Sequence, residues 1–181
     1  FEKYKYLGVF ESAGNFENTE LIRAINSVIS FLRYPVVIFD GLSPKRLLFK
    51  FYELLLSIRK VKNEDCELLI NWANCPDVRR NAINKEIILW NNHLEWFKQK
   101  VNSLSSKMYI LEFNSLPVGQ IRYDKNDSYW TVDYSIANNF RTKGLGKYMV
   151  QKTIAYFKKE TIRAFVKREN ISSIKVFESL N

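Results

Sequence analysis

A short basic loop with two glycines is the segment of this chain best suited to bind a phosphate group. It lies between a predicted strand and a predicted helix. Glycines permit positive φ angles and a close approach of the backbone to a ligand. Backbone N–H groups at a helix start, beside the positive end of the helix dipole, bind anions. The predicted pyrophosphate loop consists of Arg141, Thr142, Lys143, Gly144, Leu145, Gly146 and Lys147.

Two other kinds of phosphate-binding loop do not fit these residues. A Walker loop has four residues between its two glycines, whereas only Leu145 separates Gly144 from Gly146. A Rossmann fingerprint needs three glycines, and this loop has two. The remaining alternative is a basic helix start with a glycine turn that binds no ligand.

The elements predicted around this loop form an α+β fold with a mixed sheet. Their order is strand, two helices, three antiparallel strands, helix, strand, helix. Strands are expected over residues 55–61, 107–113, 117–123, 129–136 and 161–166. Helices are expected over residues 64–74, from a cap at Asn91 or Asn92, from Gly146 with Val150, Ile154 and Phe157 buried, and from Asn170.

Two motifs resemble those of the GCN5-related N-acetyltransferases (GNAT). Arg-x-x-Gly-x-Gly, opening a helix after an antiparallel strand, resembles motif A of this family. The segment 170–178, with Asn170, Ser173 and Phe177, resembles the motif that follows it. The resemblance covers residues 55–181. It implies a mostly antiparallel sheet that is flanked by helices and splayed between its fourth and fifth strands, with acetyl-CoA in the gap.

The resemblance also implies which residues hold acetyl-CoA. Backbone N–H groups of the loop bind the pyrophosphate, and backbone groups near Ile136 and Ala137 contact the pantetheine arm and the thioester. Asn170 and Ser173 complete the predicted cofactor-binding set. The acceptor amine then attacks the thioester directly, so no covalent enzyme intermediate is needed.

Two tryptophan-containing segments indicate the acceptor. Residues 71–79 and 90–97 resemble GNATs of the pseudaminic acid pathway, which acetylate nucleotide-linked amino sugars. Such an acceptor needs cations for its diphosphate and flat rings for its base and sugar. The predicted substrate-binding residues are Arg79, Arg80, Trp90 and His93. In the alternative interpretation, Trp90 belongs to the core and His93 is only a residue at a helix start.

The acceptor amine must be neutral to attack, so a general base is useful. Asp133 and His93 are the predicted catalytic residues, and Glu112 and Asp124 are further candidates. Asp133 lies just before the cofactor-binding stretch, although the alternation of strand residues leaves its face undetermined.

The general acid stays unassigned. GNATs often carry a Tyr in the final motif helix that protonates the leaving thiolate. Phe177 stands at that position and has no proton to donate. Tyr134, Tyr148 or water would have to serve, or the thiolate leaves unprotonated.

The composition limits the other classes of protein. The chain has 181 residues, 46% of them hydrophobic, and 28 Lys and Arg against 19 Asp and Glu give a net charge of +9. The basic residues are scattered, which disfavours nucleic acid as a partner, and no apolar run reaches the roughly 20 residues of a membrane helix. Two Cys and one His predict no metal site.

We expect a cytoplasmic enzyme that acetylates a nucleotide-linked amino sugar. The alternatives are a protein N-terminal amine acetyltransferase and a basic nucleic-acid-binding module.

The ends of the chain suggest a fragment. Residues 1–52, with Asp40-Gly41 and Arg46, resemble the C-terminal tail of the nucleotide-sugar hydrolase of the same pathway, which in some bacteria is fused upstream of a GNAT domain. The GNAT domain is expected over residues 55–181 without its last two strands. The fifth strand should then lack an outer neighbour.

Overall fold

The computed structural model describes residues 55–180, and the expectations for residues 1–52 lie outside them. Residues 56–181 group into one compact unit. Its five-stranded sheet has the strands in sequence order, with the first four antiparallel and the fifth parallel to the fourth. The strands are β1 (Leu56–Lys60), β2 (Ser106–Phe113), β3 (Leu116–Lys125), β4 (Trp130–Ile136) and β5 (Ile162–Ala164). This is the mixed, mostly antiparallel sheet that the sequence predicts.

The sheet opens between β4 and β5. Only three residue pairs join them, from Trp130–Ile162 to Val132–Ala164. The second half of β4, Asp133 to Ile136, continues along β3 without a partner in β5. The expected splay between the fourth and fifth strands is therefore present. Within residues 55–180, β5 pairs with β4 alone, and the missing outer strands stay a prediction.

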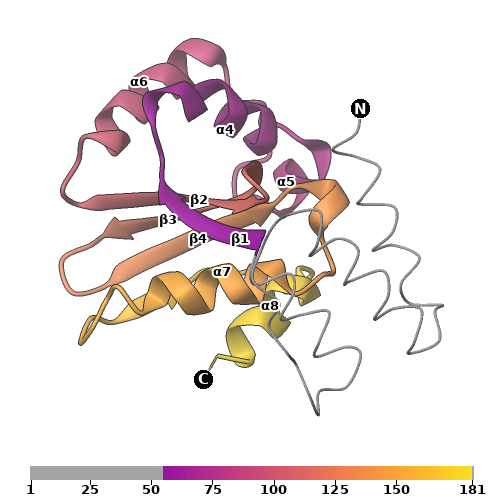
Figure 1. The fold of residues 1–181 in the computed structure, drawn as a ribbon. Helices are drawn as coiled ribbons and strands as arrows, with labels where there is room; N and C mark the ends of the chain where they lie inside the picture. The colour runs from indigo at the N-terminus through magenta and orange to yellow at the C-terminus, as the bar shows by residue number, and fades with distance from the viewer. Residues whose placement is uncertain (1–54, 181) are drawn as a thin grey trace. The chain divides into compact units, whose positions relative to one another are not determined.

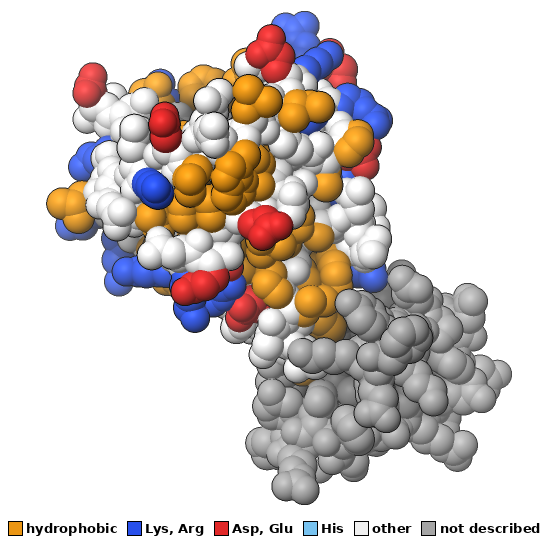
Figure 2. Space-filling model, turned by 90° about the horizontal axis from the view of Figure 1, so that it is seen from above, with side chains coloured by type: hydrophobic (Ala, Val, Ile, Leu, Met, Phe, Trp, Pro, Cys, Tyr) orange, Lys and Arg blue, Asp and Glu red, His pale blue; other side chains and the backbone are white. Residues whose placement is uncertain are grey.

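Helices cover both faces of the sheet (Figure 1). One face carries α4 (Cys66–Ala73) and α6 (Trp90–Val101), whose apolar residues pack on β2. Hydrophobic side chains also reach the surface on this side of the molecule (Figure 2). The other face carries α7 (Leu145–Ile154) and α8 (Ile171–Glu178). Short elements complete the fold: the 3-10 turns η2 (Asn63–Asp65) and η3 (Asn138–Phe140), and α5 (Pro76–Asn81).

Two predicted boundaries are wrong, and one helix was not predicted. Helix α6 begins at Trp90 and is preceded by Leu89, so neither Asn91 nor Asn92 is its cap. The helix that was not predicted is α5, which begins at Pro76 because proline suits the first position of a helix. The fifth strand has only three residues, against the six expected.

The buried face of α7 also differs from the prediction. Ile154 is the last residue of the helix and is 38% exposed, while Met149 and Thr153 are fully buried. Val150 is buried as expected. Phe157 lies beyond the helix and is buried through its ring contact with Tyr123, with 4.3 Å between the centroids.

Candidate active site

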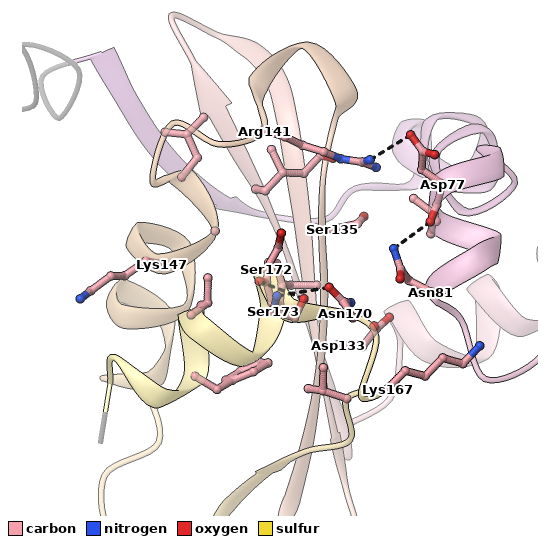
Figure 3. Close-up of a pocket in the computed structure, with 18 of the residues that line it drawn as sticks. Asp77, Asn81, Asp133, Ser135, Arg141, Lys147, Lys167, Asn170, Ser172 and Ser173 are labelled. Atoms are coloured by element: carbon pink, nitrogen blue, oxygen red, sulfur yellow. Dashed lines mark hydrogen bonds and ion pairs between the residues drawn. The ribbon is translucent and has the colours of Figure 1, made fainter.

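A cavity of about 500 Å³ occupies the opening between β4 and β5 (Figure 3). Its walls come from α5, the end of β4, the loop before α7, the segment after β5 and the start of α8. Segments far apart in sequence therefore meet at one place. Ten of the lining residues are polar or charged and labelled in the figure: Asp77, Asn81, Asp133, Ser135, Arg141, Lys147, Lys167, Asn170, Ser172 and Ser173.

The predicted pyrophosphate loop forms one wall of this cavity. Gly144 is the N-cap of α7 and has a φ of 77°, in the left-handed region that favours glycine. Thr142 adopts a φ of 61° just before it. The helix begins at Leu145, so its first N–H groups lie at the cavity. The loop thus has the geometry of an anion site at a helix start.

The second glycine of the loop is required by close packing. A Cβ atom on Gly146 would lie 2.9 Å from Cε2 of Tyr134, closer than real Cβ contacts allow. Only glycine lets α7 approach the β4 side chain this closely. The residues present therefore fit a pyrophosphate cradle, because the helix start lines the cavity and neither Gly144 nor Gly146 places a side chain there.

The cations of the loop have partners of different kinds. Arg141 donates from Nε to the carbonyl oxygen of Ile136 at 3.0 Å and from Nη1 to Oδ2 of Asp77 at 3.2 Å. Lys147 donates to the carbonyl oxygen of Ser179 at 3.3 Å. The ammonium of Lys143 lies over the ring of Phe140, 5.8 Å from the ring centroid. Lys143 does not line the cavity.

Hydrogen bonding in β4 refines the predicted backbone contacts. The N–H of Ala137 donates to the carbonyl oxygen of Val118 at 2.9 Å, so it serves the sheet. Backbone groups of an antiparallel strand alternate in direction, so those of Tyr134 and Ile136 point away from β3, toward the opening. The backbone of Tyr134, which sequence reasoning missed, is therefore better placed than that of Ala137. The period of the strand was the signal that could have identified it.

The start of α8 forms another wall of the cavity, next to β4. Asn170 is its N-cap, and the side-chain oxygen accepts a hydrogen bond from the N–H of Ser173 at 3.2 Å. Ser173 Oγ accepts a hydrogen bond from the hydroxyl of Tyr134 at 3.3 Å. The Tyr134 ring meets that of Phe177 edge to face, with 5.7 Å between the centroids. Burial raises the pKa of Tyr134, although the hydrogen bond to Ser173 acts in the opposite direction.

Asp133 projects from the other face of β4. Its side chain is 63% exposed and lines the cavity, with Oδ2 3.7 Å from Nη2 of Arg122. Arg122 also pairs with Asp124 at 2.7 Å. Burial acts to raise the pKa of Asp124, but the stronger combined effect of Lys100 and Arg122 lowers it. Asp133 is thus an accessible carboxylate at the site, whereas Asp124 is held in an ion-pair network. Glu112 pairs with Arg59 and does not line the cavity.

His93 lies in the core between α4 and α6. Its ring is 3% exposed and its Nε2 contacts the carbonyl oxygen of Cys66 at 2.9 Å, so Nε2 carries a proton. Burial lowers the pKa of His93, against the effect of this hydrogen bond. The residues that line the cavity do not include His93. The structure does not bring it together with Asp133.

The predicted acceptor residues are dispersed. Arg79 lines the cavity, but its guanidinium donates to the backbone carbonyls of Ala73, Asn84 and Glu86 and so holds the chain around α5. The side chain of Arg80 is 72% exposed and pairs with Asp77. Trp90 is 46% exposed at the start of α6 and does not line the cavity.

Sequence reasoning also missed Asp77, Asn81 and Lys167, which line the cavity. Asp77 and Asn81 come from α5, which was not predicted as a helix. Lys167 follows β5, and its Nζ donates to the carbonyl oxygens of Arg80 and Ala82. The Pro-Asp pair at 76–77 was a usable signal for a helix start. No local signal marks Lys167, whose partners lie more than 80 residues earlier.

Comparison with known proteins identifies the family. Residues 56–181 match the model of the acetyltransferase (GNAT) domain, and the chain belongs to this family. It is therefore an acetyl-CoA-dependent N-acetyltransferase. Acetyltransferase PseH of Campylobacter jejuni is 23% identical over 128 residues, covering 68% of this chain and 80% of that protein. An uncharacterized protein of Methanocaldococcus jannaschii is 28% identical over 130 residues, or 27% of its length.

Solved structures share the fold. A domain from Methanocaldococcus jannaschii has a TM-score of 0.61 at 26% identity, covering 69% of this chain and 86% of that one. Spermidine N-acetyltransferase of Vibrio cholerae, in complex with CoA and spermine, has a TM-score of 0.64 at 13% identity, covering 71% and 80%. Within residues 55–180, no helix is long and apolar enough to cross a membrane and no cluster of metal-ligating side chains occurs.

Proposed function

We propose that this N-acetyltransferase acts on the amino group of a nucleotide-linked amino sugar. The observation that carries the proposal is the similarity to PseH, which spans 80% of that acetyltransferase. The resemblance of residues 71–79 and 90–97 to the GNATs of the pseudaminic acid pathway supports it. Both segments lie on the side of the sheet that Asp133 faces.

Groups in and beside the cavity suit such an acceptor. A carboxylate, Asp133, lines the cavity and is accessible to a protonated amine. Arg80 does not line the cavity and pairs with Asp77, but its exposed guanidinium on neighbouring α5 can reach a diphosphate that extends beyond the cavity. A second cavity of about 210 Å³ adjoins the first and shares Ile136 and Arg141 with it. It is lined by Trp72, which is partly buried against the core beneath α4 and α6 and whose remaining exposed surface can stack on a nucleobase.

Asp133 is the proposed base. It accepts the proton of the acceptor amine, directly or through water, and Arg122 keeps the carboxylate oriented. Acetyl-CoA supplies the activated acyl group. The backbone groups of β4 and the start of α7 orient the thioester and the pyrophosphate.

Release of the CoA thiol tests the acceptor class. Nucleotide-linked 4-amino sugars should be turned over, whereas peptides with free N-termini should not. Robust turnover of a peptide, with none of any sugar nucleotide, would overturn the proposal in favour of a protein N-terminal amine acetyltransferase.

Two variants test the residue roles. Asp133→Asn should lower kcat on the order of a hundredfold with little change in the KM of acetyl-CoA. Arg80→Ala should raise the KM of the sugar nucleotide and leave that of acetyl-CoA unchanged. Lys60→Ala removes the same charge from the exposed end of β1 and serves as the control. An equal effect of Arg80→Ala and Lys60→Ala would remove Arg80 from the acceptor site.

A further inference from the structure

Helix α5 lies across the mouth of the opening between β4 and β5 and is bound to both walls (Figure 3). On the β4 side, Asp77 at its start pairs with Arg141 of the loop. On the β5 side, Lys167 donates to the carbonyl oxygens of Arg80 and Ala82 at its end. The two contacts differ in chemistry. The first is an ion pair that uses a cation of the predicted pyrophosphate loop, and the second consists of hydrogen bonds to backbone carbonyls.

The Asp77–Arg141 ion pair is weak enough for either side chain to bind another partner instead. The two side chains are 39% and 34% exposed, and ion pairs at such positions are worth at most about 1 kcal/mol. Each side chain also has a second partner. Asp77 Oδ1 pairs with Arg80 at 2.7 Å, and Arg141 Nε stays bonded to the carbonyl oxygen of Ile136. When the pair separates, Asp77 therefore keeps its ion pair with Arg80, and Arg141 keeps its hydrogen bond to the carbonyl oxygen of Ile136.

We propose that Asp77 competes with the pyrophosphate of acetyl-CoA for Arg141, and so couples cofactor binding to the release of the first turn of α5. A guanidinium binds phosphate through short, charge-assisted hydrogen bonds that a half-exposed carboxylate does not match. A carboxylate beside a phosphate would also be repelled. Arg141 therefore contacts either Asp77 or the pyrophosphate, and each of these contacts weakens the other.

The coupling connects the cofactor to the acceptor side of the site. Arg80 belongs to the same helix, and Lys167 keeps hold of the end of α5 when the Asp77 contact is broken. The start of α5 then moves about its fixed end. This inference rests on the proposed place of residues 141–147 at the pyrophosphate, and the experiment below tests that place separately.

The test compares acetyl-CoA affinities of full-length variants by calorimetry. Asp77→Asn keeps an acceptor oxygen but removes the charge, and affinity should rise about two- to fivefold, the range expected for a lost surface ion pair. Asp127→Asn makes the same change of charge in the turn between β3 and β4 and should have no effect. Unchanged or weaker binding by Asp77→Asn would overturn the competition. Weaker binding would show instead that Asp77 holds Arg141 in place for the cofactor.

Two further measurements separate the possible failures. Arg141→Gln should weaken acetyl-CoA binding, and Asp77→Asn should add nothing in that background. If Arg141→Gln binds acetyl-CoA normally, the Arg141 side chain does not meet the pyrophosphate and the proposal falls, whatever the backbone N–H groups of the loop bind. Hydrogen exchange over residues 76–81 should quicken when acetyl-CoA is added to the parent, whereas Asp77→Asn should exchange quickly from the outset. Slower exchange in the parent on binding would contradict the release.

Discussion

The hydroxyl of Tyr134 donates a hydrogen bond to Oγ of Ser173 at 3.3 Å, joining β4 to the first turn of α8 across the cavity. Among the described residues that line this cavity, Tyr134 is the only tyrosine. It also contacts Phe177, the residue that stands where related enzymes often have a tyrosine. A phenol is therefore present at the site, but it comes from the strand and not from the helix.

Tyr134→Phe is expected to lower kcat on the order of tenfold, with little change in either KM, because a leaving thiolate gains from a nearby proton donor. Adding Phe177→Tyr should restore part of the lost rate, since the two rings are in contact. Steady-state kinetics of the single and double variants decide this. Tyr156→Phe, at an exposed ring outside the cavity, is the matched control. A normal kcat for Tyr134→Phe would exclude Tyr134 as the proton donor.

Gly146 separates the effect of shape from that of charge at the loop. Gly146→Ala places a Cβ against Tyr134 and should weaken acetyl-CoA binding about tenfold. Gly146→Asp adds a negative charge at the phosphates and should weaken it on the order of a hundredfold. Thermal-shift titrations with acetyl-CoA measure both. Equal stabilisation of the parent and both variants would remove the loop from the cofactor site.

His93 is expected to matter for stability and not for the chemistry. His93→Leu removes the side-chain hydrogen bond to the carbonyl of Cys66, which costs about 1 kcal/mol, while kcat and both KM values should stay within twofold. Because burial lowers the pKa of His93, its contribution is present above about pH 6.5 and is lost as the pH falls. Denaturation of parent and variant at pH 7 and pH 5 measures this. A large loss of kcat at unchanged stability would restore the predicted catalytic role.

Tyr123 should govern the loss of stability at high pH. Burial raises the pKa of Tyr123 to about 12, against the hydrogen bond with Thr153. Its pKa is higher in the folded than in the unfolded chain, so its contribution is complete below pH 10 and is lost between pH 10 and 12. The loss amounts to about 3 kcal/mol at most.

Denaturant titrations at pH 8 and pH 11 check the assignment of Tyr123. Tyr123→Phe cannot ionise, so its free energy of unfolding should fall less over this interval than that of the parent. Burial raises the pKa of Tyr109 and Tyr134 as well, so some alkaline destabilisation should remain. Identical curves for parent and variant would exclude Tyr123 as the cause.

The sequence by itself determined the parts of this protein that depend on local chemistry. The loop at residues 141–147 needs glycine for a left-handed residue and for close packing, and Asn170 needs only its own side chain to begin α8. The period of strand residues likewise predicted β2 to β4 as a meander. These signals lie within a few residues of the structure that they specify.

Only the tertiary structure decided which side chains meet. His93 follows a helix pattern that suits either a site or a core, and the packing of α4 on α6 places it in the core. Asp133 could have taken either face of β4, and its pairing opposite Arg122 sets the face. Asp77 and Arg141 are 64 residues apart, so no local pattern links them. Their contact exists because the sheet opens beside β4 and α5 lies across the opening.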